Sequence, residues 1–156
     1  MKIHALLDEG LVLPRLEARD RAGILRELSA KLAARHGPGL DKDLLDKLLK
    51  REELGTTAIG KGVAVPHCRA SGIRSPALLL GLSPDGVAFD AVDGKPSHVF
   101  FLLVSPEDNP GSGLQLLAAI AGLTRKSRSL ASKLLKATKP ADIIDALRAE
   151  EDKSHA

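Results

Sequence analysis

A histidine and an arginine two positions apart are the residues of this chain best suited to chemistry. His67 follows the short run Val63–Val65 and a proline, and Arg69 comes two residues later. Neutral imidazole is a usable nucleophile near pH 7, because its unperturbed pKa is about 6.5. A guanidinium can pair two oxygens of a phosphate at once. These residue types at this spacing favour the capture of a phosphoryl group on His67, with Arg69 stabilising the phosphate.

Cys68 lies beside the histidine and raises the alternative of a cysteine–histidine nucleophile. Neighbouring residues on a strand point to opposite faces, so we expect Cys68 to be a small packed thiol instead. No set of His, Cys, Asp and Glu has the spacing of a metal site, and no Gly-x-x-x-x-Gly-Lys-Ser/Thr loop is present. The sequence therefore predicts no metal, no cofactor and no direct use of ATP.

Composition narrows the class of protein. The 156 residues carry a mild net charge of +3, no Trp, no Tyr and three Phe, so stacking platforms for nucleic-acid bases are nearly excluded. A single cysteine excludes an internal disulfide and fits a reducing compartment. The longest apolar stretches, such as Val99–Val104, are too short to cross a bilayer. We expect a cytoplasmic protein that neither binds nucleic acid nor inserts into a membrane.

Periodicity predicts helices at both ends of the chain and strands in the middle. One helix begins after Asp20 and ends before Gly37-Pro38-Gly39; a second runs from about Asp41 to Leu54. Three helical stretches follow residue 112, the last beginning at Pro140. This order indicates one α/β domain over residues 1–150, with a central sheet covered by helices and a frayed tail at residues 151–156. The expected strands are Leu11–Pro14, Val63–Val65, Pro76–Leu82, a brief Val87–Phe89 and Val99–Val104.

Two long motifs, in the right order, resemble a known family. The first joins Arg51–Gly60 to Gly62–His67, and the second joins Phe89–Pro96 to Val99–Pro106. Both are similar to the type-2 IIA domains of the bacterial phosphotransferase system, which include the fructose/mannitol IIA domains and the nitrogen-regulatory IIA proteins. The resemblance covers essentially the whole chain.

The resemblance implies a mixed sheet flanked by helices on both sides, and it implies that His67 is the phosphoryl acceptor, attacking through Nε2. The donor would be a histidine-phosphorylated carrier protein of the HPr type. The group would pass to a IIB component or act as a regulatory switch on a bound protein, and the chain carries no attached IIB or IIC domain, which favours the nitrogen-regulatory type.

The chain departs from the family at the start of the helix after the second motif. The family usually carries a second histidine there, followed by leucine, whereas this chain has Gly113 before Leu114. Either Ser112 and the helix amino terminus replace the imidazole, or the protein is a regulatory partner-binding module with weak or no phosphotransfer. Thr56 and Thr57 are further candidate donors to phosphate oxygens, provided that their loop folds over the site.

Overall fold

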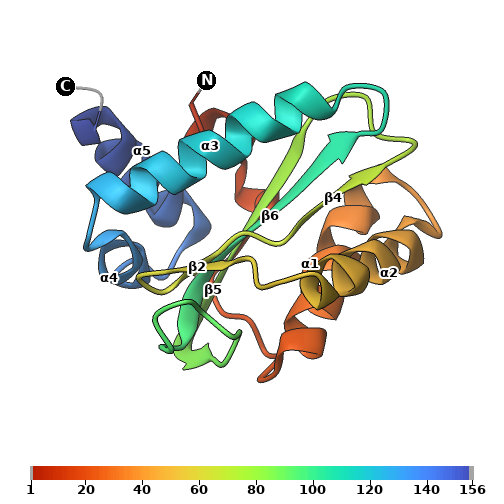
Figure 1. The fold of residues 1–156 in the computed structure, drawn as a ribbon. Coiled ribbons are helices and arrows are strands. Elements are labelled where there is room, and N and C mark those ends of the chain that lie inside the picture. The colour runs from red at the N-terminus through yellow and green to blue at the C-terminus, as the bar shows by residue number, and fades with distance from the viewer. Residues whose placement is uncertain (1, 155–156) are drawn as a thin grey trace.

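A single sheet lies between two layers of helices in the computed structural model, which describes residues 2–154 (Figure 1). Two short 3₁₀ helices, His4–Leu6 and Glu9–Leu11, precede the first strand. The remaining elements are β1 (Val12–Leu13), α1 (Arg21–His36), α2 (Leu40–Glu53), β2 (Ala58–Gly60), β3 (Val63–Ala64), β4 (His67–Ala70), β5 (Ala77–Val87), β6 (Ser97–Pro106), α3 (Pro110–Lys126), α4 (Leu130–Leu135) and α5 (Pro140–Ser154).

The strands form one mixed sheet in the order β1-β5-β6-β3-β2, and β4 also pairs with β6. Strands β5 and β6 are antiparallel, as are β2 and β3. The pairs β1–β5, β3–β6 and β4–β6 are parallel. This arrangement confirms the predicted α/β domain with a central mixed sheet and helices on both sides.

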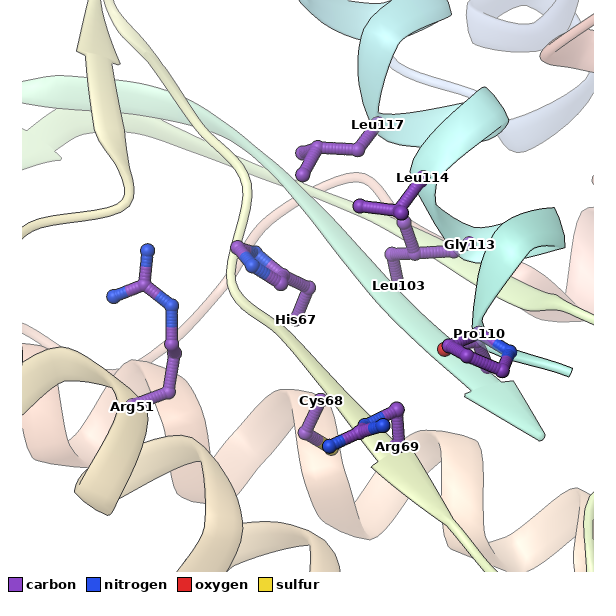
Figure 2. A pocket seen from close by; sticks show the side chains of 10 residues that line it. Arg51, His67, Cys68, Arg69, Leu103, Pro110, Gly113, Leu114 and Leu117 are labelled. Atoms are coloured by element: carbon purple, nitrogen blue, oxygen red, sulfur yellow. The ribbon is translucent and has the colours of Figure 1, made fainter. Parts of the chain in front are cut away.

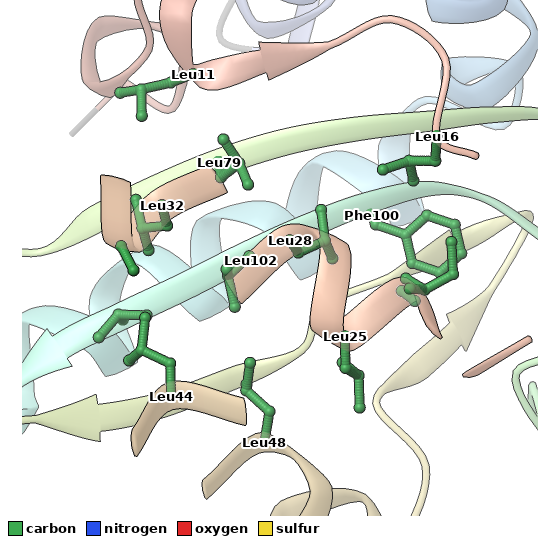
Figure 3. Packing of buried hydrophobic residues seen from close by; sticks show 14 of the residues in the cluster. Leu11, Leu16, Leu25, Leu28, Leu32, Leu44, Leu48, Leu79, Phe100 and Leu102 are labelled. Atoms are coloured by element: carbon green, nitrogen blue, oxygen red, sulfur yellow. The ribbon is translucent and has the colours of Figure 1, made fainter. Parts of the chain in front are cut away.

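Each face of the sheet has its own apolar core. Helices α1 and α2 cover one face, where Leu28, Leu44 and Leu102 are fully buried (Figure 3). Helices α3, α4 and α5 cover the other face, which includes Phe101 and Leu103. Successive residues of β6 therefore alternate between two dry layers, and a strand buried on both faces is typically almost continuously apolar.

The sequence predicted the starts of α1 and α5 correctly because local signals set both. The Asp20 side chain accepts a hydrogen bond from the Gly23 N–H at 2.7 Å and caps α1. Gly37 ends that helix with φ +139°, a conformation that favours glycine. Pro140 opens α5, where its missing N–H leaves no helical bond unmade.

Strand β5 differs from the prediction of two separate strands. It continues through Pro84 and Gly86 to Val87, although these residues read as a turn. Leu82 pairs with Val99 while Val87 pairs with Ser97, so the register shifts between them. The extra residues form a bulge in a continuous strand, and the brief separate strand at Val87–Phe89 is therefore wrong.

The predicted frayed tail is wrong for residues 151–154, which continue α5 to Ser154. The Glu151 carboxylate is buried and accepts hydrogen bonds from the N–H groups of Ile3 and His4, both at 2.7 Å. The His4 ring nitrogen Nδ1 also contacts this carboxylate at 2.7 Å. The start of the chain is therefore fastened to the last helix, while residues 155–156 of the predicted tail lie outside the described part.

The neighbouring Glu150 carboxylate is buried in a network of donors. Burial alone would raise its pKa, but hydrogen bonds from Ser127, Lys133 and Lys153 outweigh it and lower the pKa from 4.5 to about 2. The three donors lie 2.6, 3.0 and 3.2 Å from the carboxylate oxygens. A carboxyl with a lowered pKa in the folded state stabilises the fold above its unfolded pKa, and this contribution is lost as the pH falls through the folded value.

We predict that Glu150→Gln lowers the free energy of unfolding at pH 7 by about 2 kcal/mol, because hydrogen bonds to an ionised group are lost. The penalty should shrink as the pH falls from about 4.5 toward 2, where the wild-type carboxyl also becomes neutral. Urea unfolding at several pH values measures both. Asp145→Asn is the control, because its ion pair with Arg148 at 3.6 Å is exposed and should contribute little. An equal penalty at pH 7 and pH 2.5 would contradict the assignment.

Candidate functional site

Strands β3 and β4 behave as one strand interrupted by Pro66. Val63 lies opposite Val99 and His67 lies opposite Leu103, so both strands keep the same offset against β6. Proline has no N–H to donate to a ladder, but its carbonyl accepts from the Leu103 N–H at 3.0 Å. The proline therefore interrupts the pairing without shifting it, and His67 opens β4 rather than following the end of a strand as the sequence suggested.

The His67 ring is held by the backbone just before it. Its Nδ1 lies 2.8 Å from the carbonyl oxygen of Val65. A carbonyl oxygen can only accept, so Nδ1 carries the proton and donates this hydrogen bond. The lone pair is therefore on Nε2, the nitrogen that the family resemblance implied.

A cavity of about 380 Å³ lies beside the half-buried imidazole. Figure 2 shows His67 between Arg51 on one side and the start of α3, with Gly113 and Leu114, on the other. The walls thus come from β4, β6, α2 and α3. The lining residues are Arg51, His67, Cys68, Arg69, Leu103, Ser105, Pro110, Gly113, Leu114 and Leu117.

Arg51 is a site residue that the sequence analysis missed. It lies in the last turn of α2, and its Nη1 donates to the Gly55 carbonyl at 2.9 Å, which helps to hold the side chain in the lining of the cavity. The remaining guanidinium donors are free of ion pairs within residues 2–154. Its place at the start of the first sequence motif could have pointed to it, but nothing in the spacing shows that α2 brings it to His67.

Arg69, the predicted phosphate partner, lines the same cavity and shares the His67 face of β4 because it is two residues further along the strand. Its side chain is exposed, and within the described residues it also has no carboxylate at ion-pairing distance. Two guanidinium groups therefore line this cavity without an ion pair among the described residues, which favours an anion there.

The hydroxyls of Thr56 and Thr57 do not reach this cavity. Thr56 Oγ1 donates to the Phe89 carbonyl at 2.8 Å, and the Thr57 hydroxyl and N–H both bond to the buried Glu52 carboxylate. These bonds fasten the loop before β2 to α2. The structure therefore directs both hydroxyls away from the phosphate site expected for them, and Glu52 orients the loop.

Ser112 and Gly113 lie in the first turn of α3. The Ser112 hydroxyl donates to the Asn109 carbonyl at 2.9 Å, and this residue does not line the cavity. Gly113 does line it and is buried. A Cβ at position 113 would lie 2.7 Å from both Cβ and Oγ of Ser105, so the helix approaches β6 too closely for a side chain there.

Cys68 points away from the imidazole, toward the core beneath α1 and α2. Burial raises the pKa of its thiol to about 12. The charge of Lys47 lowers this pKa and that of Asp43 raises it, and both effects are smaller than that of burial. A thiol with so high a pKa is a poor nucleophile at neutral pH. The predicted packed thiol fits this environment.

The described residues hold neither a metal cluster nor a membrane span. Within residues 2–154, His, Cys, Asp and Glu side chains form no group of three or more that would hold a metal ion. In the same part of the chain, the longest helix, α3, is too short and insufficiently apolar to pass through a bilayer, and so are the other helices.

Comparison with known proteins identifies the family. The model of the phosphoenolpyruvate-dependent sugar phosphotransferase system, EIIA 2, matches residues 5–150. The chain belongs to this EIIA type-2 family. A nitrogen regulatory protein of Bradyrhizobium diazoefficiens is 35% identical over 144 residues, which are 92% of each chain. The EIIABC fructose-specific component of Bacillus subtilis is 28% identical over 145 residues, and this domain spans only 23% of its length.

Solved structures share the EIIA fold. The nitrogen regulatory protein IIA-Ntr of Neisseria meningitidis superposes with a TM-score of 0.83 at 28% identity, covering 93% of this chain and 98% of that one. The mannitol IIA of Escherichia coli, solved in complex with phosphorylated IIB, gives a TM-score of 0.72 at 16% identity and covers 92% and 97%. The second likeness concerns the fold alone.

We predict that the Cys68 thiol of this EIIA domain resists alkylation while the domain is folded. With a pKa of about 12 instead of 9.0, its thiolate fraction at pH 8 is about 1,000-fold lower than in the unfolded chain. Mass-detected labelling with iodoacetamide at pH 8, with and without 8 M urea (about the concentration that unfolds most domains), measures the difference. Comparable rates in both conditions would show that the thiol is accessible and ionised.

Proposed function

We propose that His67 accepts a phosphoryl group from a histidine-phosphorylated, HPr-like carrier protein and holds it on Nε2. One observation supports this most directly: the Val65 carbonyl fixes the proton on Nδ1, which leaves the Nε2 lone pair available at a cavity lined by two guanidiniums. No cofactor enters the reaction. We place the transfer in the cytoplasm, where phosphorylated carrier proteins are available.

In the proposed step, the Nε2 lone pair forms a bond to phosphorus while the bond from phosphorus to the donor's imidazole nitrogen breaks. The donor imidazole keeps that electron pair. His67 keeps its Nδ1 proton throughout, because the Val65 carbonyl accepts it at 2.8 Å. Phosphoryl transfer of this kind depends mainly on alignment and on donors for the equatorial oxygens.

Arg51 and Arg69 are the proposed donors to those oxygens. Arg51 approaches from α2 and Arg69 from β4, so the two guanidiniums border the cavity from different elements. Charge on the transferring group is spread over three oxygens, and hydrogen bonds from cationic groups are stronger than neutral ones. The two arginines would lower the barrier and also stabilise the phosphohistidine product.

We further propose that the phosphoryl group acts as a regulatory switch of the nitrogen-regulatory type. The chain is 35% identical to a nitrogen regulatory protein over 144 residues and 28% identical to a fructose-specific EIIABC component over 145, which supports the regulatory assignment. Relay to a IIB component is the other route, and the mannitol IIA of Escherichia coli is solved with such a phosphorylated partner.

Gly113 supports a second candidate function, a partner-binding regulatory module with weak or no phosphotransfer. The family resemblance implied a second imidazole at this position, and the close contact between Gly113 and Ser105 leaves no space for one in this backbone. The two functions differ in one measurable respect, which is whether His67 becomes phosphorylated.

We predict that a phosphorylated HPr-like carrier adds one acid-labile phosphoryl group to the wild type and none to His67→Ala. Intact-mass spectrometry at neutral pH detects the gain. His36→Ala is the control, because this histidine is exposed at the end of α1 and is not among the residues that line the cavity, and it should be labelled like the wild type. Absence of labelling in a folded wild type with a competent donor would favour the partner-binding module.

We predict that Arg51→Ala and Arg69→Ala each slow the labelling of His67 by about 10- to 100-fold, the loss expected for one hydrogen bond to a charged group. Stopped reactions with the phosphorylated carrier give the initial rates. Arg19→Ala is the matched control, because Arg19 makes only an exposed pair with Asp85 at 3.4 Å. A rate unchanged by Arg51→Ala would remove this residue from the site.

A further inference from the structure

We propose that the Ser105 hydroxyl, at the uncapped start of α3, binds an oxygen of the phosphoryl group on His67 and replaces the second imidazole of the family. The inference rests on the proposed function of His67 and adds a residue to its site. The sequence suggested Ser112 for this role, whereas Ser105 lies on β6 and lines the cavity.

The register of β4 on β6 places Ser105 beside the reacting histidine. His67 lies opposite Leu103, and Arg69 lies opposite Ser105. In parallel neighbours these four side chains share one face of the sheet. Ser105 is therefore diagonal to His67 and directly beside Arg69, on the face that carries the cavity.

The Ser105 hydroxyl is an unused donor. The residue is only 6% exposed and lines the cavity, and no described residue makes a hydrogen bond with its side chain. Ser97 on the same strand is fully buried and its hydroxyl is also unpaired, but it lies away from the cavity. Ser105, unlike Ser97, lines the cavity, so its hydroxyl can donate to an oxygen of a ligand bound there.

The first turn of α3 adds a favourable field at the same place. The helix has 17 residues, begins at Pro110, and has no side-chain cap from Asn109. The N–H groups of Gly111 and Ser112 have no partner inside the helix, and the positive end of its dipole favours an anion. Pro110 and Gly113 line the cavity, so this turn borders the same space as the Ser105 hydroxyl.

Gly113 makes this arrangement possible. The absence of a Cβ lets α3 approach β6 so closely that a Cβ added at this position would lie 2.7 Å from Ser105 Oγ. A histidine at position 113 would therefore clash with Ser105 unless the backbone shifts. The Ser105 hydroxyl on β6 thus replaces the imidazole that α3 lacks at position 113.

The chemistry of the proposed role is a hydrogen bond and nothing more. Ser105 keeps its proton, donates it to a phosphoryl oxygen, and forms no bond to phosphorus. The bond between His67 Nε2 and phosphorus is the only one made, and the donor's nitrogen–phosphorus bond is the only one broken. Arg51 would face the same group from α2, so the oxygens would have donors from both sides of the imidazole.

Ser105→Ala tests the proposal, with Ser97→Ala as the matched control on the same strand. We expect Ser105→Ala to slow labelling by a phosphorylated HPr-like carrier about 10- to 100-fold, with the KM for the carrier unchanged, because one donor to a charged oxygen is lost. Ser97→Ala should stay within about twofold of the wild type, since its hydroxyl touches no phosphoryl group. The ³¹P chemical shift of phospho-His67 should move in Ser105→Ala only, a readout that a purely structural role would leave unchanged.

The outcomes separate this inference from the function on which it rests. If the wild type is labelled and Ser105→Ala shows the same rate and the same ³¹P shift, the role of Ser105 is overturned. The phosphocarrier function would then still stand. A selective loss in Ser112→Ala would also overturn it in favour of the other serine. A folded wild type that takes no label from a competent donor would overturn both.

Discussion

The unbroken register between β6 and the interrupted strand β3–β4 is the constraint on which the site depends. Pro66 removes one N–H from the ladder, yet the offset against β6 is the same before and after it. Side chains alternate along a strand, so a slip of one residue would turn His67 toward the core beneath α1 and α2 and turn Cys68 toward the opposite face of the sheet. The order of the pairing therefore decides which of two adjacent nucleophiles can react.

The site also depends on the position of β4 at the end of the sheet. Within the described residues β4 pairs only with β6, so its other side is open to α2. Helix α2 packs on one face of the sheet and α3 on the other, and the end of one and the start of the other meet at this open strand. Arg51 comes from one layer and Gly113 from the other. Because both helical layers contribute residues here, the cavity has His67 on one strand and residues of α2 and α3 on either side of it.

The sequence was informative where structure is set locally and silent where it is set by contacts distant in the chain. The cap at Asp20 and the location of His67 in a strongly patterned motif could be predicted from neighbours alone. The anchoring of His4 by Glu151, 147 residues away, leaves no local pattern, so the last turn of α5 was mistaken for a frayed end. The bulge in β5 was mistaken for a turn for a similar reason, because only pairing with β6 shows that the strand continues.

The same distinction applies to the donors of the site: Thr56 and Thr57 have suitable hydroxyls close to the motif, but tertiary contacts use them to hold the loop. Arg51 and Ser105 reach the cavity through the packing of α2 and α3 against the sheet, which spacing along the chain does not reveal.

Gly113 is best considered together with Ser105, because the proposed site replaces an imidazole on the helix by a hydroxyl on the strand. An imidazole gains and loses its charge between pH 5 and 8, whereas a serine hydroxyl and backbone N–H groups do not titrate in that range. A phosphoryl site built from Ser105, the start of α3 and two arginines would therefore present the same donors throughout it. The exchange of an imidazole for a hydroxyl would thus leave the donors around the phosphoryl group independent of pH in this range.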